Sequence, residues 1–298
     1  MGVLCNMFKT LVLSGGAIKG VAFVGCLKYL EENNMMDSMN TFVGSSSGSI
    51  ISFLIALGYK HHEIWSLCKE GIQKYKEHDL NLDTIFNIVQ TMGLDDGHQV
   101  TEFLVSCLEK KGFSGDMSFI EFAKITGKHL VICASCINTH TDTYFSVDES
   151  PNMPVVLAIR ASISIPFIFT PVQYNDQLYV DAGLLNNFPI EKIRSAVANE
   201  CLGIMITGKC YTSNHYNLFT FARMLLESMV IKVNRKDQTS LMYHVIIDLQ
   251  DPNEDIFKFD YHSFKLDIDD RGLERFFNMG YERIKTQLLS QQPISDPQ

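Results

Sequence analysis

From residue 41 to residue 57 the chain reads TFVGSSSGSIISFLIAL: a short apolar run, a turn of serines and glycines, and a long apolar run. This order predicts a strand, a sharp turn and a helix. Gly44 and Gly48 flank Ser46 in the pattern Gly-x-Ser-x-Gly, and side chains at the two glycine positions would collide with neighbouring backbone on such a turn. The spacing therefore singles out Ser46 among three consecutive serines.

A serine at this turn lies where a helix begins. Unpaired backbone N–H groups and the positive end of the helix dipole stabilise negative charge there. Such charge develops when a serine attacks an acyl group. Because glycine and serine turns before buried helices are common, the pentapeptide alone is a modest signal of a catalytic serine.

A second glycine-rich turn, LVLSGGAIKG, covers residues 11–20 and precedes a helix predicted over residues 21–30. Gly15 and Gly20 have the spacing of a phosphate-binding loop, but Val-Ala follows where Lys-Ser or Lys-Thr binds the nucleotide. A dinucleotide fingerprint also fits poorly, because Ala17 replaces its second glycine. Two interpretations stay open: an oxyanion hole made of backbone N–H groups, or a structural turn.

A third motif lies in LYVDAGLLNNFP, residues 178–189, where Asp181 ends a β-like run. An aspartate near a glycine commonly caps a helix or forms an Asx turn. Here it follows the glycine loop and the serine turn in the same chain. The presence of all three motifs in one chain favours a functional role for Asp181.

The three motifs, in this order, resemble those of the patatin-like phospholipase family. In that family the loop reads Gly-Gly-x-[Arg/Lys]-Gly, and the aspartate motif is Asp-Gly-Gly or Asp-Ala-Gly. Residues 158–169 are also similar to the family's Ala-Ser-x-x-x-Pro-x-x-Phe stretch, so the likeness spans about residues 9–197. One departure is Ala17, where another glycine is frequent. Alanine keeps its N–H, so this departure concerns the geometry of the loop more than its chemistry.

The resemblance implies a phospholipase A, lysophospholipase or general lipid acyl hydrolase that needs no metal or other cofactor. Asp181 would remove the proton of Ser46, and Ser46 would form an acyl-enzyme that water releases. The oxyanion would be held by backbone N–H groups, and a basic side chain in the loop would place an anionic head group or simply be solvated. The further residues of this prediction are Gly15, Gly16 and Ala17 for the oxyanion, Lys19 for the head group, and the motif glycines Gly20, Gly44, Gly48 and Gly183.

The expected fold is α/β, with a mostly parallel central sheet flanked by helices. Apolar strands are predicted near residues 9–14, 41–43, 130–137, 177–180 and 202–206, and helices over much of 60–128, over 216–236 and after residue 270. Loops are expected at 93–97 and 112–115, and a polar tail at 291–298. We expect one domain over residues 1–298, with a motif core of about 9–197 and a helical C-terminal part of about 211–290.

The amino-acid composition limits the classes of partner that we expect for this protein. The 298 residues are 46% hydrophobic, enough for a large core, and the net charge is −9 without clustered basic residues, which argues against a nucleic acid partner. Residues 39–59 carry no charge, but their serines and glycines favour a buried strand and helix over a membrane span. We expect a lipid ester substrate and peripheral contact with membranes.

The eight cysteines follow no secretory leader, which favours a reducing, cytoplasmic location. Cys133 and Cys136 form a Cys-x-x-Cys pattern inside a strand-like run, which indicates buried thiols and not a reactive pair. Gly2 and Cys5 stand in a near match to a myristoylation signal, with Asn6 where serine or threonine is preferred.

Two alternatives stay open at this point. The first is a conventional α/β-hydrolase, in which Ser46 works with an aspartate and a histidine. The candidates after Asp181 are His215, His244 and His262, of which His244 lies in a strand-like run. The second is a lipid-binding or regulatory protein with an inactive site.

Overall fold

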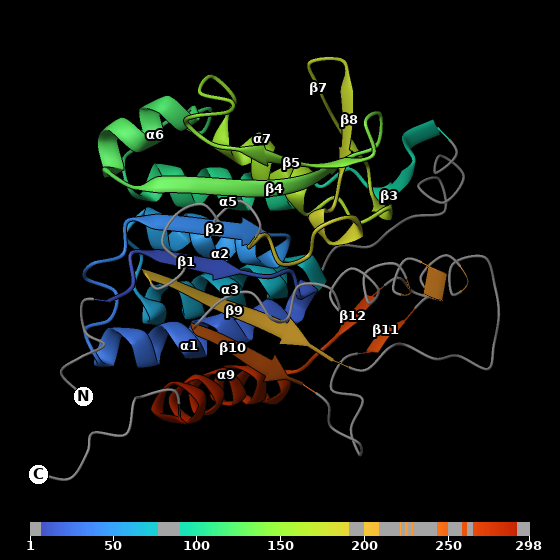
Figure 1. The fold of residues 1–298 in the computed structure, drawn as a ribbon. Coiled ribbons are helices and arrows are strands. Elements are labelled where there is room, and N and C mark those ends of the chain that lie inside the picture. The colour runs from blue at the N-terminus through green and yellow to red at the C-terminus, as the bar shows by residue number, and fades with distance from the viewer. Residues whose placement is uncertain are drawn as a thin grey trace, which may run out of the picture.

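The computed structural model describes residues 7–76, 90–190, 200–208, 221, 224–225, 228, 243–249, 258–260 and 265–290. Within them an eight-stranded sheet has the order β10-β9-β1-β2-β4-β8-β7, with β5 also paired to β4 (Figure 1). Strands β10, β9, β1, β2 and β4 are parallel, which confirms the expected mostly parallel sheet. The strands are β1 Thr10–Leu13, β2 Thr41–Ser45, β4 His129–Cys136, β5 Thr141–Phe145, β7 Val172–Tyr174, β8 Gln177–Val180, β9 Cys201–Thr207 and β10 Tyr243–Asp248.

Strand β8 runs antiparallel to its neighbour β4, which the sequence did not indicate. On one edge of β4, β2 pairs with residues 129–133 and β8 with residues 135–136. Strand β5 occupies the opposite edge over residues 132–136. Strands β2 and β8 therefore approach each other from opposite directions along the same edge and end on either side of Ala134. The residues that follow them, Ser46 and Asp181, are brought together by this register.

Helices flank the sheet, and several of them also pack on one another. They are α1 Val21–Glu32, α2 Ser47–Ala56, α3 His61–Lys76, α5 His98–Lys110, α6 Phe119–Thr126, α7 Val155–Ser162 and α9 Asp270–Ser290. Helix α2 contacts β1, β2 and β4, α7 contacts β4 and β8, and α9 contacts β10. In Figure 1, α1, α2, α3 and α5 lie behind the strands.

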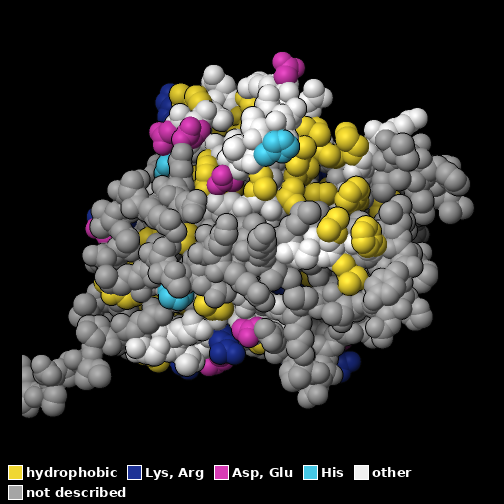
Figure 2. Space-filling view, turned by 45° about the vertical axis from the view of Figure 1, so that its right-hand side comes forward, with side chains coloured by type: hydrophobic (Ala, Val, Ile, Leu, Met, Phe, Trp, Pro, Cys, Tyr) yellow, Lys and Arg dark blue, Asp and Glu magenta, His cyan; other side chains and the backbone are white. Residues whose placement is uncertain are grey.

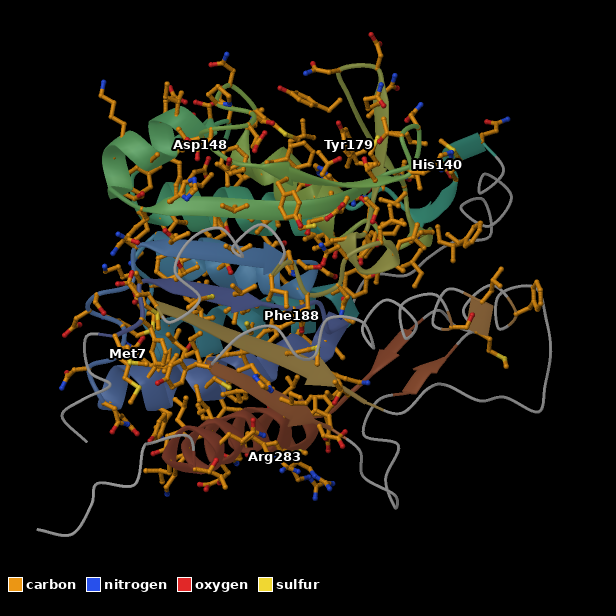
Figure 3. All side chains as sticks on the ribbon, viewed as in Figure 1. Met7, His140, Asp148, Tyr179, Phe188 and Arg283 are labelled. Carbon is orange, nitrogen blue, oxygen red and sulfur yellow. The ribbon has the colours of Figure 1, made fainter. Side chains whose placement is uncertain are left out.

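Alternate residues of each strand point to opposite faces of the sheet, and both sets are buried. Leu11 and Phe42 belong to the large core cluster that includes residues of α1 and α2. Val12 and Val43 belong to a second, smaller cluster with Phe188, which is labelled in Figure 3. Burial on both faces explains why these strands read as continuous apolar runs.

The C-terminal part differs from the helical segment expected over residues 211–290. Strand β10 joins the main sheet beside β9, and the short strands β11 (Lys258–Asp260) and β12 (Lys265–Asp267) pair antiparallel. The final helix α9 confirms the helix expected after residue 270. Most of the helix predicted over 216–236 and the whole tail at 291–298 lie outside the described residues.

Helix α9 packs against α1 at very short range. A Cβ at Gly25 would lie 1.9 Å from the carbonyl oxygen of Phe277, and a Cβ at Gly280 would lie 1.9 Å from that of Ala22. Only glycine fits where two helix backbones approach this closely. Helix α9 is thereby fixed to α1.

The middle region contains helices α3, α5 and α6, as expected, and a turn at residues 112–115. The loop expected at 93–97 is instead partly a strand. Residues Gly93–Asp95 form β3, which pairs in parallel with β6, Phe167–Phe169. Pairing with a distant segment overrides the local preference of this glycine- and aspartate-rich stretch for a turn.

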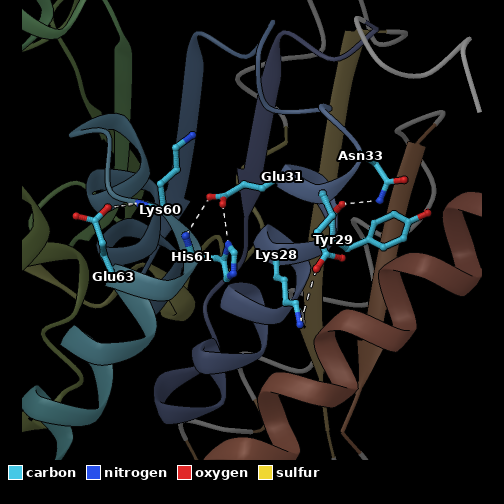
Figure 4. A network of polar contacts seen from close by, with 8 residues as sticks. Lys28, Tyr29, Glu31, Asn33, Lys60, His61 and Glu63 are labelled. Carbon is cyan, nitrogen blue, oxygen red and sulfur yellow. Dashed lines mark hydrogen bonds and ion pairs between the residues drawn. The ribbon is translucent and has the colours of Figure 1, made fainter.

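Polar contacts fix the start of α3 (Figure 4). The N–H of Lys60 donates to the carboxylate of Glu63 at 2.7 Å, which satisfies a donor at the helix N-terminus. Glu31, near the end of α1, contacts both the N–H and the ring Nδ1 of His61, at 3.0 and 2.6 Å. These contacts join α1 to α3, the helix that forms one wall of the cavity described below.

Candidate active site

Ser46 lies on the sharp turn between β2 and α2. Its backbone has φ 50° and ψ −124°, an uncommon conformation for a residue with a side chain. A Cβ at Gly44 would lie 2.5 Å from the carbonyl oxygen of Gly48, and a Cβ at Gly48 would lie 2.5 Å from the carbonyl oxygens of Leu13 and Ser14. The steric need for glycine on both sides of the serine, expected from the sequence, is thus present.

Asp181 lies directly against this serine. The Ser46 hydroxyl donates to Oδ2 of Asp181 at 2.6 Å, and the N–H of Gly183 donates to Oδ1 at 2.7 Å. Both side chains are buried, with 6% and 7% of the residue exposed. Burial raises the pKa of Asp181 from 3.8 to about 6, although the hydrogen bonds from Ser46 and Gly183 lower it. The carboxylate is therefore placed and charged to accept the serine proton at neutral pH.

The glycine-rich loop differs from expectation at its first residue. The N–H of Gly15 donates to the carbonyl oxygen of Asn187 at 2.9 Å, so this group is already used within the protein. Among the described residues no acceptor bonds to the N–H groups of Gly16 and Ala17. Ala17 has φ 48° and opens the short 3-10 helix Ala17–Gly20. Of the three predicted donors, Gly16 and Ala17 are the two that remain available.

The loop is tied to β9 by Ser14. Its N–H donates to the carbonyl oxygen of Ile204 at 3.1 Å, and its Oγ accepts from the N–H of Ile206 at 3.0 Å. On the other side, a Cβ at Gly20 would lie 2.7 Å from Oγ of Ser47. The loop is thus held between β9 and the start of α2.

Lys19 extends toward the end of β9. Its Nζ would lie 2.8 Å from a Cβ placed on Gly208, and Lys19 does not line the cavity beside Ser46. A role for Lys19 in head-group binding stays a prediction.

The histidine alternative finds no support in the described part of the chain. His244 lies in β10, where it pairs with Gly203 of β9, and β1 separates β9 from β2. At about 4.8 Å between neighbouring strands, this imidazole is too far from Ser46 for direct proton transfer. His215 and His262 lie outside the described residues. The contact between Ser46 and Asp181 is direct.

A cavity of about 860 Å³ opens beside Ser46. Its walls come from α2, α3, α5 and the segment that follows α7, and they are mostly apolar. Two polar atoms of the wall, Oγ of Ser47 and Oε1 of Gln99, are buried without a hydrogen-bond partner. The apolar lining includes Ile50, Leu67, Ile72, Val100, Phe103 and Ile168.

Sequence reasoning missed this cavity because the walls that α3 and α5 contribute carry no motif. Helices α3 and α5 are ordinary amphipathic helices, and an apolar stripe facing a cavity has the same spacing as one facing a core. Only the tertiary arrangement distinguishes the two.

Cys133 and Cys136 are buried on β4, as predicted, and burial raises the pKa of Cys133 well above its usual value. No group of three or more His, Cys, Asp or Glu side chains suited to a metal ion occurs among the residues that the structure describes. Within the same residues, no helix combines the length and apolar character needed to cross a bilayer.

Comparisons with known proteins identify the family of the chain. A family model described as patatin-like phospholipase matches residues 11–193. The chain is 35% identical over 187 residues to the probable lipid hydrolase 463L of Invertebrate iridescent virus 6, covering 62% of each protein, and thus less than two thirds of that relative. It is 23% identical over 192 residues to lysophospholipase NTE1 of Candida albicans, covering 64% of this chain and 12% of that protein.

The fold is similar to that of VipD from Legionella pneumophila, with a TM-score of 0.60 and 15% identity over 96% of this chain and 67% of that one. At this identity the likeness concerns the fold alone. The family match covers more than half of the chain, and it includes the glycine-rich loop, the serine turn and Asp181. The chain therefore belongs to the patatin-like phospholipase family.

Proposed function

We propose that this protein is a lipid acyl hydrolase of the phospholipase A or lysophospholipase type, acting through Ser46 and Asp181 within a single acyl hydrolase domain. The observation that carries the proposal is the 2.6 Å hydrogen bond from the buried hydroxyl of Ser46, which lies on a strained turn, to the buried carboxylate of Asp181. Backbone strain of this kind, of order 1–3 kcal/mol, is concentrated at functional sites. The names of the viral and yeast relatives support a lipid ester as substrate.

In this mechanism Asp181 accepts the proton of Ser46 as its oxygen attacks the ester carbonyl carbon. The resulting tetrahedral oxyanion is stabilised by the N–H groups of Gly16 and Ala17, each donor contributing about 3–4 kcal/mol where this has been measured in other enzymes. The proton passes from Asp181 to the leaving alcohol, which departs and leaves an acyl group on Ser46. Water then adds to the acyl-enzyme by the same steps in reverse order, and the free acid and Ser46 are restored.

The apolar cavity beside Ser46 fits the acyl chain of such a substrate. Each methylene moved from water into an apolar site contributes about 0.8 kcal/mol to binding. A chain seated between α3 and α5 would reach Ser46 with its ester end, because Ser46 itself lines the cavity.

A lipid surface is the proposed partner of the face near β3. Figure 2 shows hydrophobic side chains gathered on the face that comes forward from the right of Figure 1, where β3 lies. Met92 precedes β3, Phe167 opens β6, and they are 48% and 49% exposed. The segment of Phe167 also supplies Ile165 and Ile168 to the cavity wall, so this face adjoins the proposed acyl site.

Hydrolysis should depend on pH through the carboxyl group of Asp181. Because the base acts only when deprotonated and its pKa is about 6, kcat/KM should fall tenfold per pH unit below about 6 and level off above 7. A soluble p-nitrophenyl butyrate assay between pH 4.5 and 8.5, with buffers of constant ionic strength, measures this. A folded protein whose rate is unchanged between pH 4.5 and 7 would contradict Asp181 as the base.

Filling the cavity should change the preference for chain length. Val100 lines the cavity from α5, and Val100→Phe should remove room for about two methylenes, lowering kcat/KM for long-chain esters about 15-fold. Cleavage of p-nitrophenyl acetate should change less than about twofold, since its acyl group needs little of the cavity. The ratio of the two rates is the measurement.

His98→Phe is the matched control for this variant. His98 is exposed on the same helix and does not line the cavity, so the added ring should leave both rates unchanged. Equal losses for the short and the long ester in Val100→Phe would show that the cavity does not hold the acyl chain.

A further inference from the structure

The end of α7 and the residues after it contact both members of the candidate dyad. Oγ of Ser162 accepts a hydrogen bond from the N–H of Ser46 at 2.9 Å. The carbonyl oxygen of Ser164 accepts one from the N–H of Asp181 at 2.8 Å. Only Ile163 separates these two anchors along the chain. One short segment thus fixes the main chains of the nucleophile and of the base at a set spacing.

The turn that carries Ser46 needs support of this kind. A serine with positive φ keeps that conformation only when surrounding contacts hold it there. The carbonyl oxygen of Ser46 accepts from the N–H and the hydroxyl of Ser49, at 2.8 and 2.6 Å, but Ser49 belongs to α2 and moves with the turn. The bond to Ser162 connects the N–H of Ser46 to a separate helix.

This segment is itself anchored by Arg160, which is only 5% exposed. Its Nη1 donates to Oγ of Ser164 at 2.7 Å, and its Nη2 donates to the carbonyl oxygens of Asp96 and Thr170 at 2.9 and 3.1 Å. The guanidinium also lies 5.0 Å from the ring centre of Phe169, a residue of the cavity wall. Through Arg160, the segment that bonds to Ser46 and Asp181 is therefore held against Phe169 in the wall of the cavity.

We infer that Ser162 is a positioning residue that holds Ser46 against Asp181, so that its hydroxyl supports turnover without contributing to substrate binding. The inference rests on the proposed function. Ser162 is completely buried and does not line the cavity, so its effect on the reaction must pass through Ser46. Displacing a reacting group by about 1 Å is enough to lower a rate about a hundredfold.

The test compares Ser162→Ala with the wild type by two readouts: hydrolysis of p-nitrophenyl butyrate, and the rate at which a fluorophosphonate modifies Ser46. We expect kcat and the labelling rate to fall together by about tenfold or more. KM should stay within about twofold. The pH midpoint should move upward if it moves at all, because the hydrogen bond from Ser46 lowers the pKa of Asp181 and a displaced Ser46 would lower it less. Ser162→Thr, which retains the hydroxyl, should recover most of the activity.

Two further variants distinguish a positioning role from a loss of stability. Ser162→Cys preserves the size of the side chain but replaces Oγ with a weak acceptor, and it should show the same loss if Ser162→Ala does not fold. Ser146→Ala is the matched control: Oγ of Ser146, 2% exposed, accepts from the N–H groups of Asp148 and Glu149 at 3.2 and 3.3 Å. It should melt earlier than wild type yet keep wild-type kcat.

The possible results distinguish the inference about Ser162 from the proposed hydrolase function. If the wild type is labelled at Ser46 and the folded Ser162→Ala or Ser162→Cys variant reacts at the same rate, the inference is wrong and the proposed function stands. If Ser146→Ala loses kcat to the same extent, the effect is one of general stability and the inference is wrong as well. If the folded wild type neither hydrolyses esters nor reacts with the fluorophosphonate, the proposed function fails first and the inference falls with it.

Discussion

A fluorophosphonate should modify the purified protein at Ser46 and at neither Ser45 nor Ser47. An activated serine attacks phosphorus as it attacks an ester carbonyl, and only the hydroxyl of Ser46 is bonded to a carboxylate, Asp181, among these three. Ser46→Ala should abolish labelling and lower hydrolysis of lipid esters by more than about a thousandfold, since removal of a nucleophile has effects of this size or larger. Mass spectrometry of peptides identifies the modified residue.

The matched control is Ser52→Ala. Ser52 is a fully buried serine of α2 whose hydroxyl donates to the carbonyl oxygen of Val43 at 3.2 Å, away from Asp181. This variant should be labelled at the wild-type rate. Labelling that persists in Ser46→Ala, or a folded wild type that stays unmodified, would contradict the assignment of Ser46.

Asp181→Asn should lower kcat by about a hundredfold or more while making the protein more stable. The loss of activity follows from the loss of the proton acceptor. The amide is nearly isosteric, and its oxygen can still accept from the N–H of Gly183 while its nitrogen donates to Ser46. The fold should therefore be kept, and steady-state kinetics together with thermal melts give both quantities.

The gain in stability has a definite pH dependence. The carboxyl of Asp181 titrates at 3.8 in the unfolded chain and at about 6 in the folded one, so folding takes up a proton between these pH values. Its contribution to the free energy of unfolding decreases as pH rises from about 4 to about 6, and above 6 the buried carboxylate costs about 3 kcal/mol. Asparagine avoids this cost. The variant should melt several degrees above wild type at pH 8 and close to it at pH 4.

Two outcomes would contradict these expectations. A folded Asp181→Asn protein with wild-type kcat shows that another group is the base, and parallel His244→Ala, His215→Ala and His262→Ala variants would then locate it. A variant that melts below wild type at pH 8 shows that Asp181 stabilises the fold, which is incompatible with a carboxylate kept at a cost for catalysis.

The candidate pair could be singled out from sequence because each residue stands in a short motif whose spacing follows from local geometry. Gly44 and Gly48 are required by close backbone contacts within one turn, and such contacts leave a fixed pattern in the sequence. The parallel strands were predictable for a similar reason. Burial on both faces makes each of them a continuous apolar run.

Other features depend on residues distant in sequence. The direction of β8 is set by its pairing with β4, about 40 residues earlier, and nothing within residues 177–180 encodes it. The N–H of Gly15 was expected to face the substrate, but the carbonyl oxygen of Asn187, far along the chain, takes it. The position of Ser162 beside Ser46 likewise appears only when α7 packs on the sheet.

The meeting of β2 and β8 at Ala134 determines the order in which the enzyme can acquire reactivity during its own synthesis. The glycine-rich loop, Ser46 and the whole of β4 leave the ribosome before Asp181 does, because they precede it in the chain. The proposed base follows more than forty residues later, on a strand that can dock only after β4 is in place. In the proposed mechanism, a nascent chain therefore carries an unactivated serine, and ester cleavage would begin only once β8 has added to the sheet.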